Sequence, residues 1–187
     1  ITRKKRKFAE AVIEEVLSPS ADRIQPPCPH FGVCGGCTLQ NVAYQKQLVY
    51  KRSQVQDLME RIGGLKDLEV RPVLPSPQQF GYRNKMEYTF GAHRWITPEE
   101  IVSGEKISRD FALGLHVPKR FDRILDLKEC LLQDPVSIRI LEICRETAIS
   151  KGWRPYDVVD HSGYLRNLII RKGINTGDLL VNLVTTR

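Results

Sequence analysis

Apolar residues between Val42 and Ile62 recur every three or four positions, a spacing that predicts an amphipathic helix. The stripe consists of Leu48, Val55, Leu58, Met59 and Ile62. Asn41 is the expected N-cap of this helix, and the Gly63-Gly64 pair is expected to end it.

A second helix is predicted from Asp134, a favoured N-cap residue followed directly by a proline, to about Lys151. Its apolar face consists of Ile140, Leu141, Cys144 and Ala148. Cys144 is therefore interpreted as an ordinary core cysteine, because a free thiol packs like a small apolar side chain.

Strict alternation in "YRNKMEYTF", residues 82–90, predicts a half-buried strand. The side expected to face the core carries Tyr82, Met86, Tyr88 and Phe90, and the solvent side carries Arg83, Lys85, Glu87 and Thr89. "FALGLHV", residues 111–117, is a further strand, and "YLRNLIIRKG" with "GDLLVNLVTT" predicts an antiparallel hairpin across "INTG". The predicted fold class is α/β (α+β), with a mostly antiparallel sheet and flanking helices.

The N-terminal segment is ambiguous. Ala9, Val12, Ile13 and Val16 fit a helical stripe, yet alternation in the same residues also fits a strand. The following "SPSADRIQPPCP" is a linker, because its prolines cannot continue a helix or a strand ladder.

Composition favours a polyanionic partner. Twenty-nine Lys and Arg residues against 22 Asp and Glu give a net charge of +7, with a dense basic run at residues 3–7. Such charge attracts the phosphates of nucleic acids, although a basic run can also be a solvated arm. The sequence shows no membrane-spanning apolar run and no signal-peptide pattern, so a cytoplasmic protein without a membrane partner is expected.

Three cysteines lie within ten residues in "CPHFGVCGGC", at positions 28, 34 and 37. Glycines let such a short loop turn three thiols toward one centre. Zinc and a [4Fe-4S] cluster both need four ligands, and Cys130 is a better candidate for the fourth than His30. The alternative is three reduced, unligated cysteines or a fortuitous disulfide, whereas a disulfide framework is not expected in a chain without export signals.

Three stretches, "CPHFGVCGGCTLQ", "YRNKMEYTFG" and "LGLHVPKRFDRILDLKEC", resemble the iron-sulfur RNA (uracil-5-)-methyltransferases of the 23S rRNA 5-methyluridine type. That resemblance implies transfer of a methyl group from S-adenosylmethionine to uridine during RNA processing, with rRNA preferred to tRNA as the partner. It also implies that Cys28, Cys34, Cys37 and Cys130 hold a [4Fe-4S] cluster with a structural or RNA-positioning role. Arg83 and Lys85, which belong to the same predicted strand as Tyr82, would face the RNA.

The resemblance also implies a division of the chain. Residues 1–27 would be the end of an OB-like TRAM β-barrel plus a linker, with Phe8 to Leu17 as a strand. Residues 28–40 would be the cluster loop, and residues 41–187 a central RNA-binding α/β domain. The nucleophilic cysteine, the base and the Rossmann-like domain would follow this segment, so no catalytic residue is assigned within it. The alternative is a stand-alone zinc or iron-sulfur nucleic-acid-binding module without catalysis.

Overall fold

Six strands form one sheet in the order β4-β6-β5-β3-β7-β8, and the computed structural model describes all residues 1–187. The strands are β3 (Lys85–Gly91), β4 (Arg94–Trp95), β5 (Ala112–His116), β6 (Ile124–Asp126), β7 (Leu165–Lys172) and β8 (Leu179–Thr185). Every neighbouring pair is antiparallel except β4 with β6. The predicted mixed α/β fold with a mostly antiparallel sheet is confirmed, and the predicted hairpin is β7 with β8.

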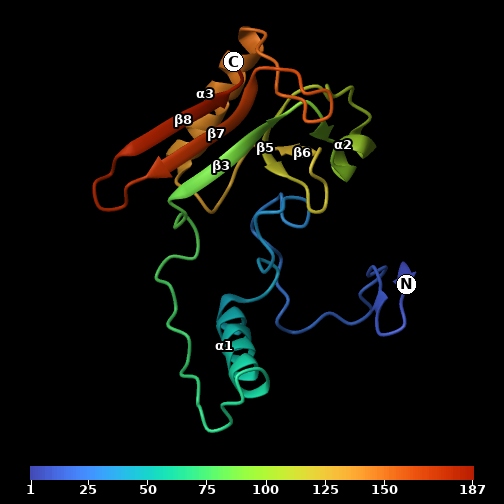
Figure 1. Cartoon of the computed structure of the whole chain (residues 1–187), viewed down its shortest axis with the longest axis vertical. Helices are drawn as coiled ribbons and strands as arrows, with labels where there is room; N and C mark the ends of the chain where they lie inside the picture. Colours follow the sequence, from blue (N-terminus) through green and yellow to red (C-terminus); the bar gives the residue numbers. More distant parts are fainter.

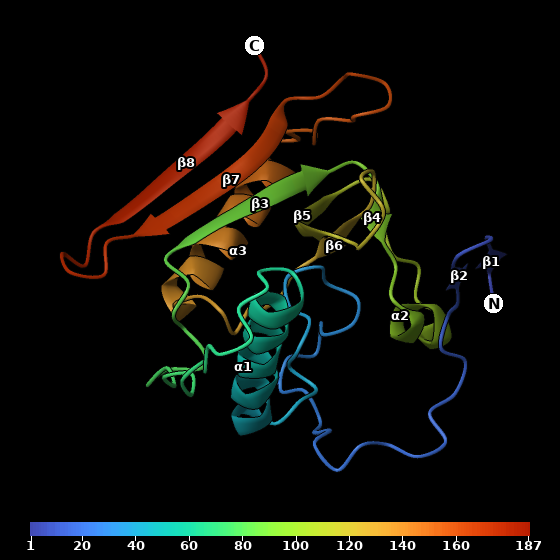
Figure 2. The ribbon, with the colours of Figure 1, turned by 60° about the horizontal axis from the view of Figure 1, so that its bottom comes forward.

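One face of this sheet carries the long helix α3 (Pro135–Ser150), as Figures 1 and 2 show. Asp134 caps the helix as predicted, because its carboxylate accepts a hydrogen bond of 2.9 Å from the Val136 amide. Leu141 and Ala148 are buried, and Cys144 packs half-buried against the same core. The interpretation of Cys144 as a packing residue therefore agrees with its position.

The alternation predicted for the central strand is confirmed within β3. Met86, Tyr88 and Phe90 are buried, whereas Lys85 and Glu87 are exposed. The placement of Tyr82 in the core is wrong. Residues 81–83 lie before the strand begins, where the amides of residues 81 and 83 bond to the carbonyls of residues 131 and 132, and the Tyr82 side chain is 54% exposed.

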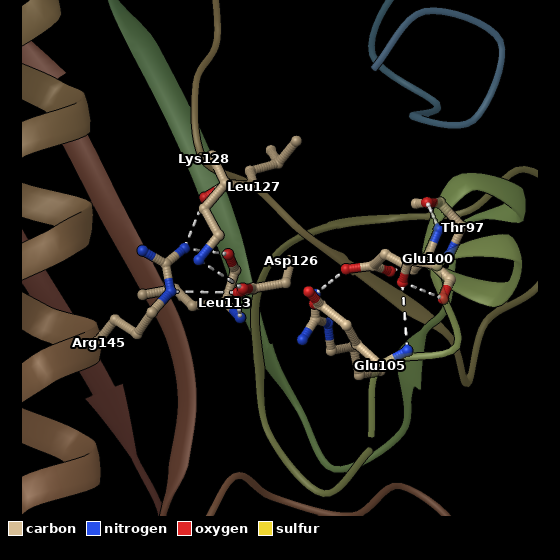
Figure 3. Close-up of polar contacts among 10 residues, drawn as sticks. Thr97, Glu100, Glu105, Leu113, Asp126, Leu127, Lys128 and Arg145 are labelled. Carbon is tan, nitrogen blue, oxygen red and sulfur yellow. Dashed lines mark hydrogen bonds and ion pairs between the residues drawn. The ribbon is translucent and has the colours of Figure 1, made fainter. Parts of the chain in front are cut away.

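A buried ion pair joins α3 to the sheet, and the sequence pattern did not predict it (Figure 3). Arg145 Nε donates to Asp126 Oδ1 at 3.2 Å, and the guanidinium also donates to the Leu127 carbonyl at 2.5 Å. The same carboxylate oxygen accepts the Leu113 amide at 3.0 Å. The helix is thereby fixed to β5, to β6 and to the residue that follows β6.

The long helix α1 (Tyr44–Arg61) lies apart from the sheet, and none of its residues is buried (Figure 1). It ends before the glycine pair as predicted, but its N-cap is Ala43 rather than Asn41, and no side chain caps it. At this end of the helix, the preceding linker forms hydrogen bonds with the backbone of Asn41 and Ala43. Ile24 N donates to Asn41 O at 3.0 Å, and Ala43 N donates to Asp22 O at 2.9 Å.

The predicted strand from Phe8 to Leu17 is wrong over most of its length. Only Ala9–Glu10 form a strand, β2, which pairs with β1 (Arg3–Lys4) in a short hairpin. The residues after β2 have no neighbouring strand to supply ladder hydrogen bonds, and Val12 and Ile13 are more than 70% exposed. A TRAM barrel is accordingly not seen in residues 1–187.

A short helix, α2 (Pro98–Ser103), follows β4 and was not predicted. Thr97 and Glu100 form a capping box, in which each side chain accepts a hydrogen bond from the other residue's amide (Figure 3). None of the helices is both long and apolar enough to cross a membrane.

We expect Arg145→Ala to lower the free energy of unfolding by about 3–5 kcal/mol, because it leaves the Asp126 carboxylate buried without its partner. Urea unfolding followed by circular dichroism measures the change. The matched control is Arg139→Ala on the exposed side of α3, where the ion pair with Glu142 is at the surface. The control should change stability by no more than about 0.5 kcal/mol, and equal midpoints for the two variants would contradict a stabilising role for the buried pair.

Candidate cluster site and adjacent basic surface

All four cysteines predicted as ligands border one small cavity between the cysteine loop and the end of β6. Cys28, Cys34 and Cys37 come from the loop, and Cys130 follows β6. Besides the four cysteines, the cavity is lined by the apolar side chains of Phe31, Leu115, Leu127, Leu131 and Leu132. The structure therefore brings together thiols that are far apart in the sequence and surrounds them with apolar side chains.

The loop is folded by short-range backbone hydrogen bonds. The amides of Phe31 and Cys34 donate to the carbonyls of Cys28 and His30, at 3.2 and 2.8 Å. Gly36 N donates to Cys34 Sγ at 3.3 Å. A Cβ at Gly36 would lie only 3.3 Å from that sulfur, so glycine permits the close approach of this backbone to the thiol.

Cys130 is positioned by the turn between β6 and α3. Burial raises the pKa of the Cys130 thiol, and the neighbouring amides of Leu132 and Gln133 oppose part of this increase. Gln133 is buried, and its Oε1 accepts a hydrogen bond of 2.7 Å from the hydroxyl of Tyr88 in the middle of β3. The turn that carries the fourth thiol is thus anchored in the core of the sheet.

Burial is the main electrostatic influence on these thiols. It raises the pKa of Cys28, Cys34 and Cys130 above the ordinary range for cysteine, and negative charge on neighbouring thiolates raises the pKa of each further. Hydrogen bonds from backbone amides and, at Cys130, the charge of Arg83 oppose this effect on the pKa. Four thiolates around one apolar cavity need positive charge between them, which iron or zinc would supply.

Two buried polar atoms at this cavity have no hydrogen-bond partner. They are His30 Nε2 and Gln40 Oε1, and both residues border the cavity with the thiols. Burial lowers the pKa of His30, which favours the neutral ring. A protonated Nε2 could donate to a sulfide or thiolate in the cavity, so the donor set fits an iron-sulfur group. No three His, Cys, Asp or Glu side chains converge as a single metal ion requires.

Arg83 and Lys85, the predicted RNA-binding residues, lie at the surface beside this site. The Arg83 amide donates to the Leu132 carbonyl at 2.9 Å, two residues after the fourth cysteine, and both side chains are exposed. Neither side chain forms an ion pair. Lys85 also lies directly opposite Arg171 in β7, and like charges in this position repel each other unless an anion lies between them.

Nothing in the sequence pattern indicated that Lys85 and Arg171 are cross-strand neighbours, because the register of β3 against β7 is a property of the folded sheet. Lys172 differs from them, since its ammonium pairs with Asp134 at the start of α3. Arg166 stacks over the ring of Tyr156, 4.4 Å from its centroid. The unpaired basic groups of this region are therefore concentrated at the start of β3 and the end of β7.

Relatives of the chain are RNA methyltransferases by name. An uncharacterized RNA methyltransferase of Chlorobaculum tepidum is 43% identical over 183 residues, which are 97% of this chain and 38% of that protein. One from Bacteroides thetaiotaomicron is 40% identical over 98% of this chain and 40% of its own length. The chain thus spans about two fifths of the curated relatives it matches. No family model matches it.

A solved structure has a similar fold. The tRNA (uracil-54, C5)-methyltransferase of Pyrococcus abyssi, solved in complex with S-adenosyl-L-homocysteine, superposes with a TM-score of 0.63 at 25% identity. The superposition covers 92% of this chain and 34% of that one. The predicted resemblance to RNA methyltransferases is confirmed at that level, whereas the iron-sulfur subtype and the methylated position stay predictions.

We expect Tyr88→Phe to destabilise the fold by about 1–3 kcal/mol, because the buried Oε1 of Gln133 would lose its hydrogen-bond donor. Chemical denaturation monitored by fluorescence tests this expectation. Tyr156→Phe is the matched control, because it removes a hydroxyl whose contact with His161 is exposed. If both variants lost the same stability, the anchoring of the Cys130 turn through Tyr88 would be wrong.

Proposed function

We propose that the chain is the cluster- and RNA-binding portion of an S-adenosylmethionine-dependent RNA methyltransferase that forms 5-methyluridine. The observation that carries the proposal is that Cys28, Cys34, Cys37 and Cys130 all line one cavity beside the exposed Arg83. The names of the relatives, and the uracil-C5 activity for which the solved neighbour is named, support methylation of a uracil in RNA.

In this proposal the four cysteines hold a [4Fe-4S] cluster. When bound, the cluster would supply positive charge to neutralise four partly buried thiolates, and it would rigidly connect the loop to the end of β6. His30 would donate a hydrogen bond to it, and the Leu132 and Gln133 amides would stabilise the Cys130 thiolate. The role is structural, and a reduced cytoplasmic environment suits thiolate ligands.

Residues 1–187 contribute binding to the proposed reaction. Methylation at carbon 5 of uracil calls for a thiolate nucleophile, which must be accessible and activated. Cys144 does not meet this requirement, because burial raises its pKa and it packs against the core. The proposal therefore assigns methyl transfer and S-adenosylmethionine binding to the part of the relatives that this chain does not span.

The proposed domain division follows the same logic. Residues 28–40 form the cluster loop, residues 41–187 form the RNA-binding α/β unit, and residues 1–27 precede them as a basic segment and linker. Both rRNA and tRNA are substrates to test, because rRNA follows from the resemblance and the solved neighbour is a tRNA enzyme.

We expect anaerobically purified protein to contain about four iron and four sulfide per chain and to absorb broadly in the visible range. Cys130→Ser should lose this absorption and most of the iron, because it removes a ligand. Cys144→Ser is the matched control and should keep both. One zinc per chain without sulfide would contradict the cluster and support a zinc-stabilised binding module instead.

We expect Arg83→Ala combined with Lys85→Ala to weaken RNA binding and to flatten its salt dependence. Loss of two phosphate contacts to single-stranded RNA should reduce the slope of log K against log salt by about 1.4. Fluorescence anisotropy with labelled rRNA and tRNA fragments between about 50 and 200 mM salt measures the slope.

The charge-matched control for this double variant is Arg139→Ala combined with Lys151→Ala, at exposed positions on and just after α3. α3 covers the face of the sheet opposite to the one from which Lys85 projects. The control should therefore leave the slope of log K against log salt unchanged. An equal reduction in both double variants would mean that RNA binding follows net charge rather than the proposed surface.

A further inference from the structure

A second cavity of about 500 Å³ lies between the end of the cysteine loop, the start of α1 and the segment that leads into β3. Its volume falls within the range of small-molecule sites in proteins. Gly36, Cys37, Gln40 and Leu132 line both this cavity and the thiol cavity. The two cavities are therefore neighbours that share a wall.

Two exposed aromatic residues lie on this second cavity. Phe80 is 39% exposed and Tyr82 is 54% exposed, and neither packs against another aromatic ring. Large aromatic side chains that remain accessible beside a cavity can stack on flat ligands. Unstacked nucleobases are such ligands, and every base offers a face for stacking.

The polar lining supplies free hydrogen-bonding atoms. Gln47 uses its Nε2 to bond the carbonyls of Leu39 and Val42, at 3.0 and 2.9 Å, which leaves its Oε1 available. The Tyr44 hydroxyl accepts the Ser76 amide at 2.8 Å and retains a proton to donate. Amide and hydroxyl groups of this kind match the donors and acceptors on the edge of a base.

Charge at this cavity favours an anionic strand. Lys51 is the single charged residue in the lining; it is exposed and forms no ion pair. No acidic side chain lines the cavity. Arg83 directly follows Tyr82 in the sequence, so an RNA strand whose phosphate contacts Arg83 would present an adjacent base to the aromatic wall.

We propose that this cavity, which we call the glutamine pocket, receives an unstacked nucleobase of a single-stranded RNA segment. Phe80 and Tyr82 stack on the base, the glutamine amides bond to its edge, and Lys51 neutralises a neighbouring phosphate. The proposal rests on the proposed RNA-binding function and adds the position at which the RNA is held by a base rather than by its phosphates.

The test compares binding of a labelled single-stranded RNA oligonucleotide and of the same sequence as a duplex, measured by fluorescence anisotropy. Phe80→Ala combined with Tyr82→Ala should weaken single-strand binding about tenfold or more, because stacking on an aromatic side chain contributes substantially to each bound base. The salt slope should not change, since no charge is removed. Phe80→Trp, which keeps a stacking surface, should bind like the unaltered protein.

Phe121→Ala is the matched control, since Phe121 is 75% exposed in a loop that lines neither cavity. It should leave both affinities unchanged. Unfolding midpoints of all variants should agree, which separates loss of binding from loss of folding.

Each outcome has one meaning. A loss confined to single-stranded RNA in the double variant, together with unaltered binding by Phe80→Trp, supports the glutamine pocket. Unaltered single-strand affinity in the double variant, or an equal loss for duplex and single strand, overturns it. If Arg83→Ala with Lys85→Ala still weakens binding in that case, the proposed RNA-binding function stands without the pocket. If the unaltered protein binds neither RNA, both proposals fail.

Discussion

The buried ion pair between Arg145 and Asp126 is the interaction on which the position of the candidate site depends. Removing both charges from water is costly, and their attraction together with hydrogen bonds to backbone groups offsets that cost. The pair fixes α3 against β5 and β6, and four residues beyond Asp126 the chain reaches Cys130. An ionic contact in the core thereby helps to fix the position of the fourth thiol, which is distant in sequence from the loop but borders the same cavity.

A second constraint acts at the thiol cavity itself. Burial raises the pKa of Cys28, Cys34 and Cys130, so the folded chain places these three sulfurs where negative charge is unfavourable. The backbone amides at Gly36, Leu132 and Gln133 point at these sulfurs and partly compensate. In the proposed cluster site, this combination of an apolar wall with amide donors would suit a metal-sulfur group, and binding of that group would stabilise the fold.

Local sequence signals predicted the helices and strands that are determined by neighbouring residues in the chain. Asp134 with Pro135 marked the start of α3, and alternation marked β3, because capping and burial depend on nearby residues. Elements that depend on distant partners were not predicted correctly. The segment after β2 has β-like alternation but no strand beside it, and the burial of Arg145 follows only from the position of Asp126. The four cysteines were grouped by their chemistry, which does not require knowledge of the fold.

The shared wall between the thiol cavity and the glutamine pocket relates the two proposed functions physically. Gly36, Cys37 and Leu132 contribute to both, so a group that fixes the thiols also fixes one side of the surface offered to RNA. Arg83 adds a direct connection, because its amide bonds to the Leu132 carbonyl and its charge opposes the increase that burial causes in the pKa of Cys130. A rigid metal-sulfur group in the first cavity would thus preorganise the second, which reduces the entropy lost when RNA binds. A structural cluster can in this way contribute to RNA recognition without touching the RNA or exchanging electrons.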